Sequence, residues 1–177
     1  MPDHPPAVTL GVAITVPTPW REELAGWRER VGDPEAARVP PHVTLLPPTE
    51  VPADRLPEIE DHLAEAAADF PAFELHLSGT GTFRPVSDVV FVVVAAGIAQ
   101  CEQLEARVRS GPLGRQTRFP YHPHVTVAHD IPPAGLEAAY AGLADFDARF
   151  VVSGFTVFEQ ETGGIWVTRK DFTLLGS

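Results

Sequence analysis

Residues 120–130 read PYHPHVTVAHD and hold three of the seven histidines of this chain. The tetrapeptide Pro-His-Val-Thr inside this stretch also occurs in residues 40–48, which read PPHVTLLPP. Alternating polar and β-branched residues favour a short strand in both copies. One histidine of the repeated motif, His42, thus lies in the first half of the chain, and the other, His124, lies in the second half.

The two tetrapeptides occupy equivalent places in a longer order of predicted elements. Each half contains the pattern of a strand, a helix, the His-Val-Thr strand, a second helix and a strand with Ser-Gly. Proline pairs flank the first His-Val-Thr strand, and the glycines at 79 and 81 indicate a bulge or a close approach of the backbone. The predicted strands cover residues 8–17, 42–46, 73–83, 89–96, 124–127 and 152–158. The predicted helices cover residues 18–31, 52–70, 98–108 and 132–143.

This order indicates an internally duplicated chain, with approximate repeats at residues 8–83 and 89–158 and a final strand at residues 164–175. We expect one two-lobed domain over residues 1–177. Two similar units in a compact domain usually pack about a pseudo-twofold axis. Such an axis brings equivalent strands, and therefore the two His-Val-Thr segments, to face each other across a cleft.

Each segment presents an imidazole beside a hydroxyl, because alternate residues of a strand point to the same side. His42 shares a face with Thr44, and His124 shares a face with Thr126. If the pairs meet across a cleft, one neutral histidine can take a proton from an attacking oxygen while the other, protonated, gives one to the leaving oxygen. The hydroxyls can hold phosphoryl oxygens, so this chemistry needs neither a metal nor a cofactor. The motifs are nearly identical, so the sequence does not distinguish acid from base.

Two other interpretations of these histidines stay open. In the first, both imidazoles donate to backbone carbonyls at sheet edges, and the repeat preserves a fold without a site. In the second, His122 and His124 form a His-x-His pair that binds a metal together with His129 and Asp130. The first half has no counterpart of His122 or His129, so the duplication favours the acid–base pair.

The formal net charge of −11 opposes binding to long nucleic acids, which depends on neutralising phosphates. We therefore expect no long duplex as a partner, whereas a small phosphorylated substrate or an RNA end needs only a local cationic pocket. Near the second motif, Arg115, Arg118 and Tyr121 form a basic, aromatic stretch. It is suited to a second phosphate or to stacking a base, and a solvated loop is the alternative.

The longest apolar run, residues 89–96, is far shorter than the roughly 20 residues that cross a bilayer. The N-terminus also lacks the layout of a secretion signal. We therefore expect a cytoplasmic protein with no membrane partner. The single cysteine, Cys101, excludes an internal disulfide and a multi-cysteine zinc site, and its helical spacing predicts a buried apolar role.

The motifs HVTL at residues 42–45 and HVTV at residues 124–127, set in a duplicated plan, resemble the His-x-Thr-x motifs of the two-histidine phosphoesterase superfamily. The resemblance is to its bacterial 2′-5′ RNA ligase-like or RNA 2′,3′-cyclic phosphodiesterase group, and it covers nearly the whole chain. It implies a bilobal α+β fold in which two antiparallel sheets line a central cleft, with helices on the outside. It also implies metal-independent hydrolysis of a 2′,3′-cyclic phosphate to a 2′-phosphate.

On this resemblance, His42 and His124 are the catalytic pair, and Thr44 and Thr126 bind the phosphate of the substrate. Phe83, at the end of the first Ser-Gly strand, is a candidate for a base pocket. Some relatives join or split 2′-5′ linkages in RNA, so ligase activity is a further expectation. We expect a monomer that acts on a small cyclic-phosphate nucleotide or an RNA terminus. The alternative is a module of the same fold that binds a nucleotide or RNA end without turnover.

Overall fold

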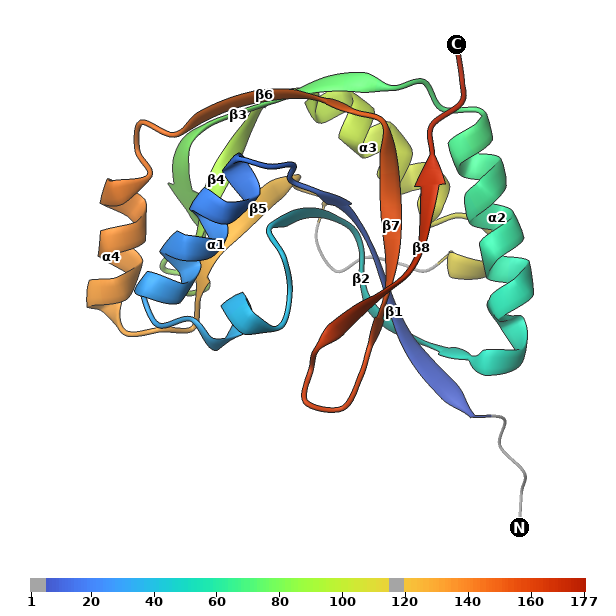
Figure 1. The fold of residues 1–177 in the computed structure, drawn as a ribbon, viewed down its shortest axis with the longest axis horizontal. Helices are drawn as coiled ribbons and strands as arrows, with labels where there is room; N and C mark the ends of the chain where they lie inside the picture. Colours follow the sequence, from blue (N-terminus) through green and yellow to red (C-terminus); the bar gives the residue numbers. More distant parts are fainter. Residues whose placement is uncertain (1–5, 115–119) are drawn as a thin grey trace.

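The computed structural model describes residues 6–114 and 120–177, and Figure 1 shows how the helices and strands are arranged. The strands are β1 (Ala7–Thr15), β2 (His42–Pro52), β3 (Phe73–Thr82), β4 (Val89–Ala96), β5 (His124–His129), β6 (Asp147–Val152), β7 (Gly154–Gln160) and β8 (Trp166–Thr173). The helices are α1 (Trp20–Arg30), α2 (Leu56–Ala68), α3 (Ile98–Val108) and α4 (Pro133–Gly142), with 3₁₀ turns η1 (Pro34–Ala37), η2 (Ala53–Arg55) and η3 (Gly111–Leu113).

In the described part of the chain, the strands form one curled antiparallel sheet in the order β6-β3-β4-β5-β2-β1-β7-β8. The two halves of the sheet meet where β5 lies beside β2, and the residue pair that joins them is Val43 with Val125. Strand β3 follows β2 in the chain but lies in the half with β4 and β5, whereas β7 lies beside β1. Each half therefore contains strands from both sequence repeats, which ties the repeats together.

Helices cover the outside of each half of the sheet. Helix α4 packs on β3, β4 and β5, and α1 contacts β5, whereas α2 contacts β8 and α3 contacts β2. Figure 1 shows α1 and α4 together at one end of the molecule and α2 at the other. Trp27 of α1 lies directly against Gly142 of α4, where a side chain at Gly142 would overlap the indole ring.

The α+β fold with antiparallel strands, outer helices and a pseudo-twofold arrangement is confirmed. The two sheets expected from the sequence are the halves of one continuous sheet, joined at Val43 and Val125. The buried role predicted for Cys101 is also confirmed, because its side chain is fully buried in the core and burial raises the pKa of its thiol to about 12.

The strand predicted at residues 152–158 corresponds to β7, which begins at Gly154, and the sequence did not predict β6, which precedes it. Strand β6 pairs with β3, and β7 pairs with β1 and β8 in the other half of the sheet. The change of partner occurs at Ser153 and Gly154. An added Cβ at Gly154 would lie 2.5 Å from the carbonyl oxygen of Phe172, so glycine permits the close approach of β7 and β8.

Strand β2 is longer than predicted, because it runs through Pro47 and Pro48 instead of ending before them. Its pairing with β1 shifts register between the Leu46 and Thr49 partners, so the prolines lie in an irregular segment where no regular ladder hydrogen bond is lost. The bulge predicted near the glycines of β3 is confirmed, since the register with β4 shifts around Gly79, whose φ is 71°.

Among the described residues, no helix is both long enough and apolar enough to span a bilayer.

The close approach at Gly154 generates a prediction about stability. Gly154→Ala should lower the free energy of unfolding by about 1–3 kcal/mol, because the backbone of Phe172 cannot move aside cheaply. Gly26→Ala is the control, since Gly26 lies in α1 with no heavy atom within 4 Å of an added Cβ. Alanine at that position should be neutral or stabilising by up to about 1 kcal/mol. Urea unfolding of both variants measures the difference, and equal effects would contradict the close approach.

Candidate functional site

The two His-Val-Thr segments lie side by side at the centre of the sheet, where β2 meets β5. Because Val43 pairs with Val125 in antiparallel register, the histidine of each strand lies beside the threonine of the other. The two valines are fully buried, whereas the histidines and threonines are half-buried. The alternation of each strand therefore brings two imidazoles and two hydroxyls to the same face.

Both imidazoles are anchored in the same way. Nδ1 of His42 donates to the carbonyl oxygen of Pro40 at 2.7 Å, and Nδ1 of His124 donates to that of His122 at 2.7 Å. A carbonyl can only accept, so Nδ1 carries the proton of each neutral ring and Nε2 remains for a bound molecule. The backbone anchoring expected from a purely structural role is present, but it uses one nitrogen of each ring.

His42, Thr44, His124 and Thr126 line one cavity of about 590 Å³, which we call the cleft. Both halves of the sheet contribute to its walls. Its volume is typical of sites that bind small molecules. The structure thus gathers the four residues of the two motifs around a single space.

A second cavity of about 490 Å³, the side pocket, adjoins the cleft. The two cavities share Thr44, Phe83 and His124. Tyr121 also lines the side pocket, and its hydroxyl donates to the carbonyl oxygen of Thr44 at 2.7 Å. The other described residues of its walls are largely apolar and include Leu45, Pro47, Val86 and Pro120. Phe83 and Tyr121, which the sequence put forward as substrate contacts, therefore lie beside the motif residues.

Aromatic rings pack against both imidazoles. The ring centroid of Trp166 lies 5.5 Å from that of His42. The ring centroids of Phe83 and Phe91 lie 5.1 Å and 5.2 Å from that of His124. Gly11 leaves room for Trp166, because an added Cβ would lie 2.5 Å from its ring. These contacts restrict the orientation of each imidazole beyond what its hydrogen bond fixes.

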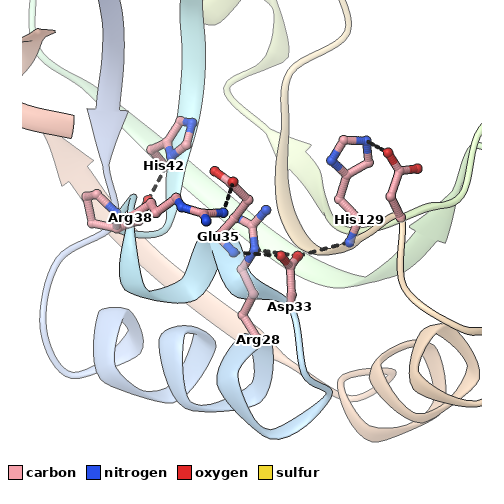
Figure 2. A network of polar contacts seen from close by, with 8 residues as sticks. Arg28, Asp33, Glu35, Arg38, His42 and His129 are labelled. Atoms are coloured by element: carbon pink, nitrogen blue, oxygen red, sulfur yellow. Dashed lines mark hydrogen bonds and ion pairs between the residues drawn. The ribbon is translucent and has the colours of Figure 1, made fainter. Parts of the chain in front are cut away.

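A network of polar contacts forms one wall of the cleft, and Figure 2 shows it from close by. Nε of Arg28 donates to the carboxylate of Asp33 at 2.8 Å, and these side chains are only 8% and 1% exposed. The same carboxylate accepts the backbone N–H of Glu35 at 2.9 Å and that of His129 at 3.0 Å. The bond to His129 fastens the segment after α1 to the end of β5.

Arg28 is the permanent cation of this wall, and the buried carboxylate of Asp33 balances its charge. Among the described residues that line the cleft, it is the one arginine or lysine. Glu35 on the same wall is paired with Arg38 at 2.9 Å, and His129 is paired with Asp130 at 3.2 Å. Most charges on this wall therefore have a partner of opposite sign.

Burial lowers the pKa of both imidazoles of the motifs. For His42, the bond to the Pro40 carbonyl opposes this effect, and the nearby charges of Arg28 and His124 lower the pKa further. For His124, the bond to the His122 carbonyl opposes burial, and the charge of His122 adds to it. Both rings are therefore biased towards the neutral form while the cleft holds no anion.

The remaining candidates from the sequence are placed as follows. Arg115 and Arg118 lie outside the described residues. His122 is exposed and packs at the edge of Phe83, while His129 pairs with Asp130. Within residues 6–114 and 120–177, no group of three or more histidine, cysteine, aspartate or glutamate side chains is arranged to hold a metal ion.

Sequence reasoning missed Arg28, Asp33 and Trp166. Arg28 lies within the helical pattern of α1, and Asp33 follows the glycine that ends this helix, so neither position indicates burial. Trp166 follows a Gly-Gly turn at the start of the last predicted strand. An aromatic residue at the tip of a predicted hairpin indicates a candidate site residue. The ring that Trp166 packs against, that of His42, is distant in the chain, so the sequence does not reveal the contact.

The Arg28–Asp33 pair generates a prediction about stability. Asp33→Asn should lower the free energy of unfolding by about 3 kcal/mol, because it leaves the guanidinium of Arg28 buried without its counter-charge. Glu58→Gln is the control, since it breaks an exposed ion pair with Arg55, worth about 0–1 kcal/mol. Denaturant unfolding at neutral pH measures both, and similar losses would show that the buried pair adds no stability.

A family model described as the 2′-5′ RNA ligase superfamily matches residues 16–164, a range that includes both His-Val-Thr segments. The chain belongs to this superfamily. Two relatives carry the name "Putative phosphoesterase". That of Geobacillus kaustophilus is 26% identical over 94% of this chain and 96% of its own length. That of Bacillus thuringiensis is 28% identical over 93% of this chain and 96% of its own length.

Solved structures agree with this membership of the 2′-5′ RNA ligase superfamily. The structure of E. coli LigT complexed with 3′-AMP is similar with a TM-score of 0.72 and 25% identity, covering 96% of this chain and 99% of that one. The structure of TT0787 of Thermus thermophilus is similar with a TM-score of 0.68 and 25% identity, covering 96% of this chain and 99% of that one. The similarity therefore extends over the whole fold.

Proposed function

We propose that the chain is a metal-independent cyclic phosphodiesterase that hydrolyses 2′,3′-cyclic phosphates of nucleotides or RNA ends. The observation that carries the proposal is the grouping of His42, Thr44, His124 and Thr126 around one cleft, with Nε2 of each imidazole left for substrate. Membership of the 2′-5′ RNA ligase superfamily and the phosphoesterase names of relatives support it.

In the proposed reaction, a water oxygen attacks the phosphorus of the cyclic phosphate and the bond to the ribose 3′ oxygen breaks. One neutral histidine takes a proton from the water through Nε2, and the other, protonated, donates one to the 3′ oxygen. The hydroxyls of Thr44 and Thr126 donate to the non-bridging phosphoryl oxygens. The product is a 2′-phosphate, and both histidines return to their starting states by exchanging protons with solvent.

A nucleotide or a short RNA end is the substrate class that fits this site. The net charge of −11 disfavours a long polyanion, whereas the imidazoles and hydroxyls of the two motifs are enough to hold a single phosphate in the cleft. Solved structures of E. coli LigT contain 3′-AMP, NADP⁺, ATP and phosphate, all of them small anions. Joining or splitting 2′-5′ linkages uses the same proton transfers, so ligase activity belongs in the same assay.

The histidines provide the direct test. His42→Ala and His124→Ala should each lower kcat on nucleoside 2′,3′-cyclic phosphates by about 10²–10⁴-fold, because each removes one proton transfer. His76→Ala is the matched control, since His76 pairs with Asp147 at the sheet edge, away from the cleft. Hydrolysis should be measured in the presence of a chelator, together with binding of the product.

The outcomes separate the alternatives. Lost turnover with retained product binding in the two variants supports the enzyme. A wild-type protein that binds these nucleotides without hydrolysing any would instead favour a binding module, and activity that disappears in chelator and returns with a divalent ion would overturn the metal-independent reaction.

The lowered pKa values predict the pH dependence. The general base must be neutral and the general acid protonated, so lowering both pKa values moves both limbs of the profile to lower pH. The bell-shaped curve of kcat/KM should therefore centre below about pH 6.5, the ordinary pKa of histidine. Steady-state kinetics between pH 4 and 9 would test this, and a centre above about pH 7.5 would contradict it.

A further inference from the structure

We propose that the side pocket binds the nucleobase of the substrate and that Arg109 recognises the keto group of guanine or uracil there. The proposal rests on the proposed function, because it requires a nucleotide whose phosphate lies between His42 and His124. It adds a specificity-determining residue outside the two motifs and names the bases that the site prefers.

The position of the side pocket suits a base attached to that phosphate. The pocket adjoins the cleft through Thr44, Phe83 and His124, so a ribose at this junction can place its phosphate in the cleft and its base in the pocket. The volume of about 490 Å³ exceeds what a phosphate needs. Flat rings of Phe83 and Tyr121 among apolar neighbours offer stacking surfaces for a heteroaromatic ring.

Arg109, which follows α3, brings a polar group to these apolar walls. Its side chain is 12% exposed, and it donates to the Glu105 carboxylate at 2.9 Å. Nε of Arg109 is buried and has no hydrogen-bond partner within the described residues. A guanidinium carries five N–H donors and no acceptor, so the group retains donors beyond the one that Glu105 accepts.

The charge of this wall favours a neutral ligand over a second phosphate. Glu105 is also only 12% exposed, and it balances the positive charge of Arg109 inside the protein. The pair therefore presents donors without a net charge, next to apolar walls. An uncharged aromatic ring that carries a hydrogen-bond acceptor matches such a pocket better than an anion does.

The direction of the base selects which acceptor meets Arg109. The sugar must point to the cleft, so the opposite edge of the base points away from it. Arg109 lines the side pocket but not the cleft, so it can meet the part of the base that lies away from the phosphate. Guanine and uracil carry a keto oxygen on this edge, whereas adenine and cytosine carry an amino group, which is also a donor. The guanidinium of Arg109 and such an amino group are both donors, so both would stay unpaired, which weakens the affinity for adenine and cytosine.

Kinetics on four nucleoside 2′,3′-cyclic phosphates test the proposal. The wild-type protein should favour the guanine and uracil substrates over the adenine and cytosine substrates by about 10-fold in kcat/KM. Arg109→Met should reduce this preference to about twofold or less, because methionine fills the space without a donor. The preference should be unchanged in Arg107→Met, since Arg107 lies near the same helix end, is 48% exposed and pairs with Asp69.

A double variant tests the same point if Arg109→Met alone is too unstable to assay. Arg109→Met leaves Glu105 buried without its partner, so the double variant Arg109→Met, Glu105→Gln removes both charges and should lose the base preference in the same way. If neither variant folds, the base preference of the wild-type protein decides the question. Equal kcat/KM values for the four substrates would overturn the proposal.

Binding separates this proposal from the proposed function. The affinities of the four nucleoside 2′-monophosphates can be measured by calorimetry whether or not turnover occurs. Keto-selective binding that depends on Arg109, without hydrolysis, would support the base pocket and contradict the enzyme. Hydrolysis of all four substrates at equal rates, with unselective binding, would support the enzyme and contradict the base pocket.

Discussion

The pairing of Val43 with Val125 is the constraint on which the rest of the site depends. It joins the two halves of the sheet, and its register sets which side chains of β2 and β5 are neighbours. A slip of one residue in either strand would turn a valine towards the cleft and a histidine into the core. Both valines are fully buried, so their packing opposes such a slip. The apolar residue in the middle of each motif therefore positions the polar residues on both sides of it.

The Asp33 carboxylate supplies a second connection, between the segment after α1 and the end of β5. It binds Arg28 of α1, and it accepts the backbone N–H of His129 where β5 ends. A carboxylate with three donors is well compensated for its burial, and it holds the guanidinium of Arg28 close enough to influence His42. Packing of the fold and electrostatics of the cleft thus depend on the same side chains.

Local patterns were enough to predict the arrangement of the motifs, because alternation along a strand fixes the direction of each side chain. His42 and Thr44 share a face for this reason alone, and the duplication indicated that a second pair would meet them. Other features depend on distant contacts. The division into β6 and β7 arises from pairing with different strands, and neither Arg28 nor Trp166 shows in the sequence that it lies near His42. Tertiary packing determines these positions, so local propensity could not predict them.

The same burial that lowers the pKa of both imidazoles also makes them responsive to substrate. Burial of the two rings favours their neutral form, which provides the general base but leaves few molecules with a protonated acid. A phosphate between the rings favours the charged form, and the low dielectric of the cleft strengthens that attraction. Binding of the anion should therefore raise the pKa of the rings and generate the imidazolium that the reaction needs. The negative charge of the substrate therefore generates the acid of this buried site. Because the pKa values of the rings are higher in the complex, the pH profile of kcat is centred at a higher pH than that of kcat/KM.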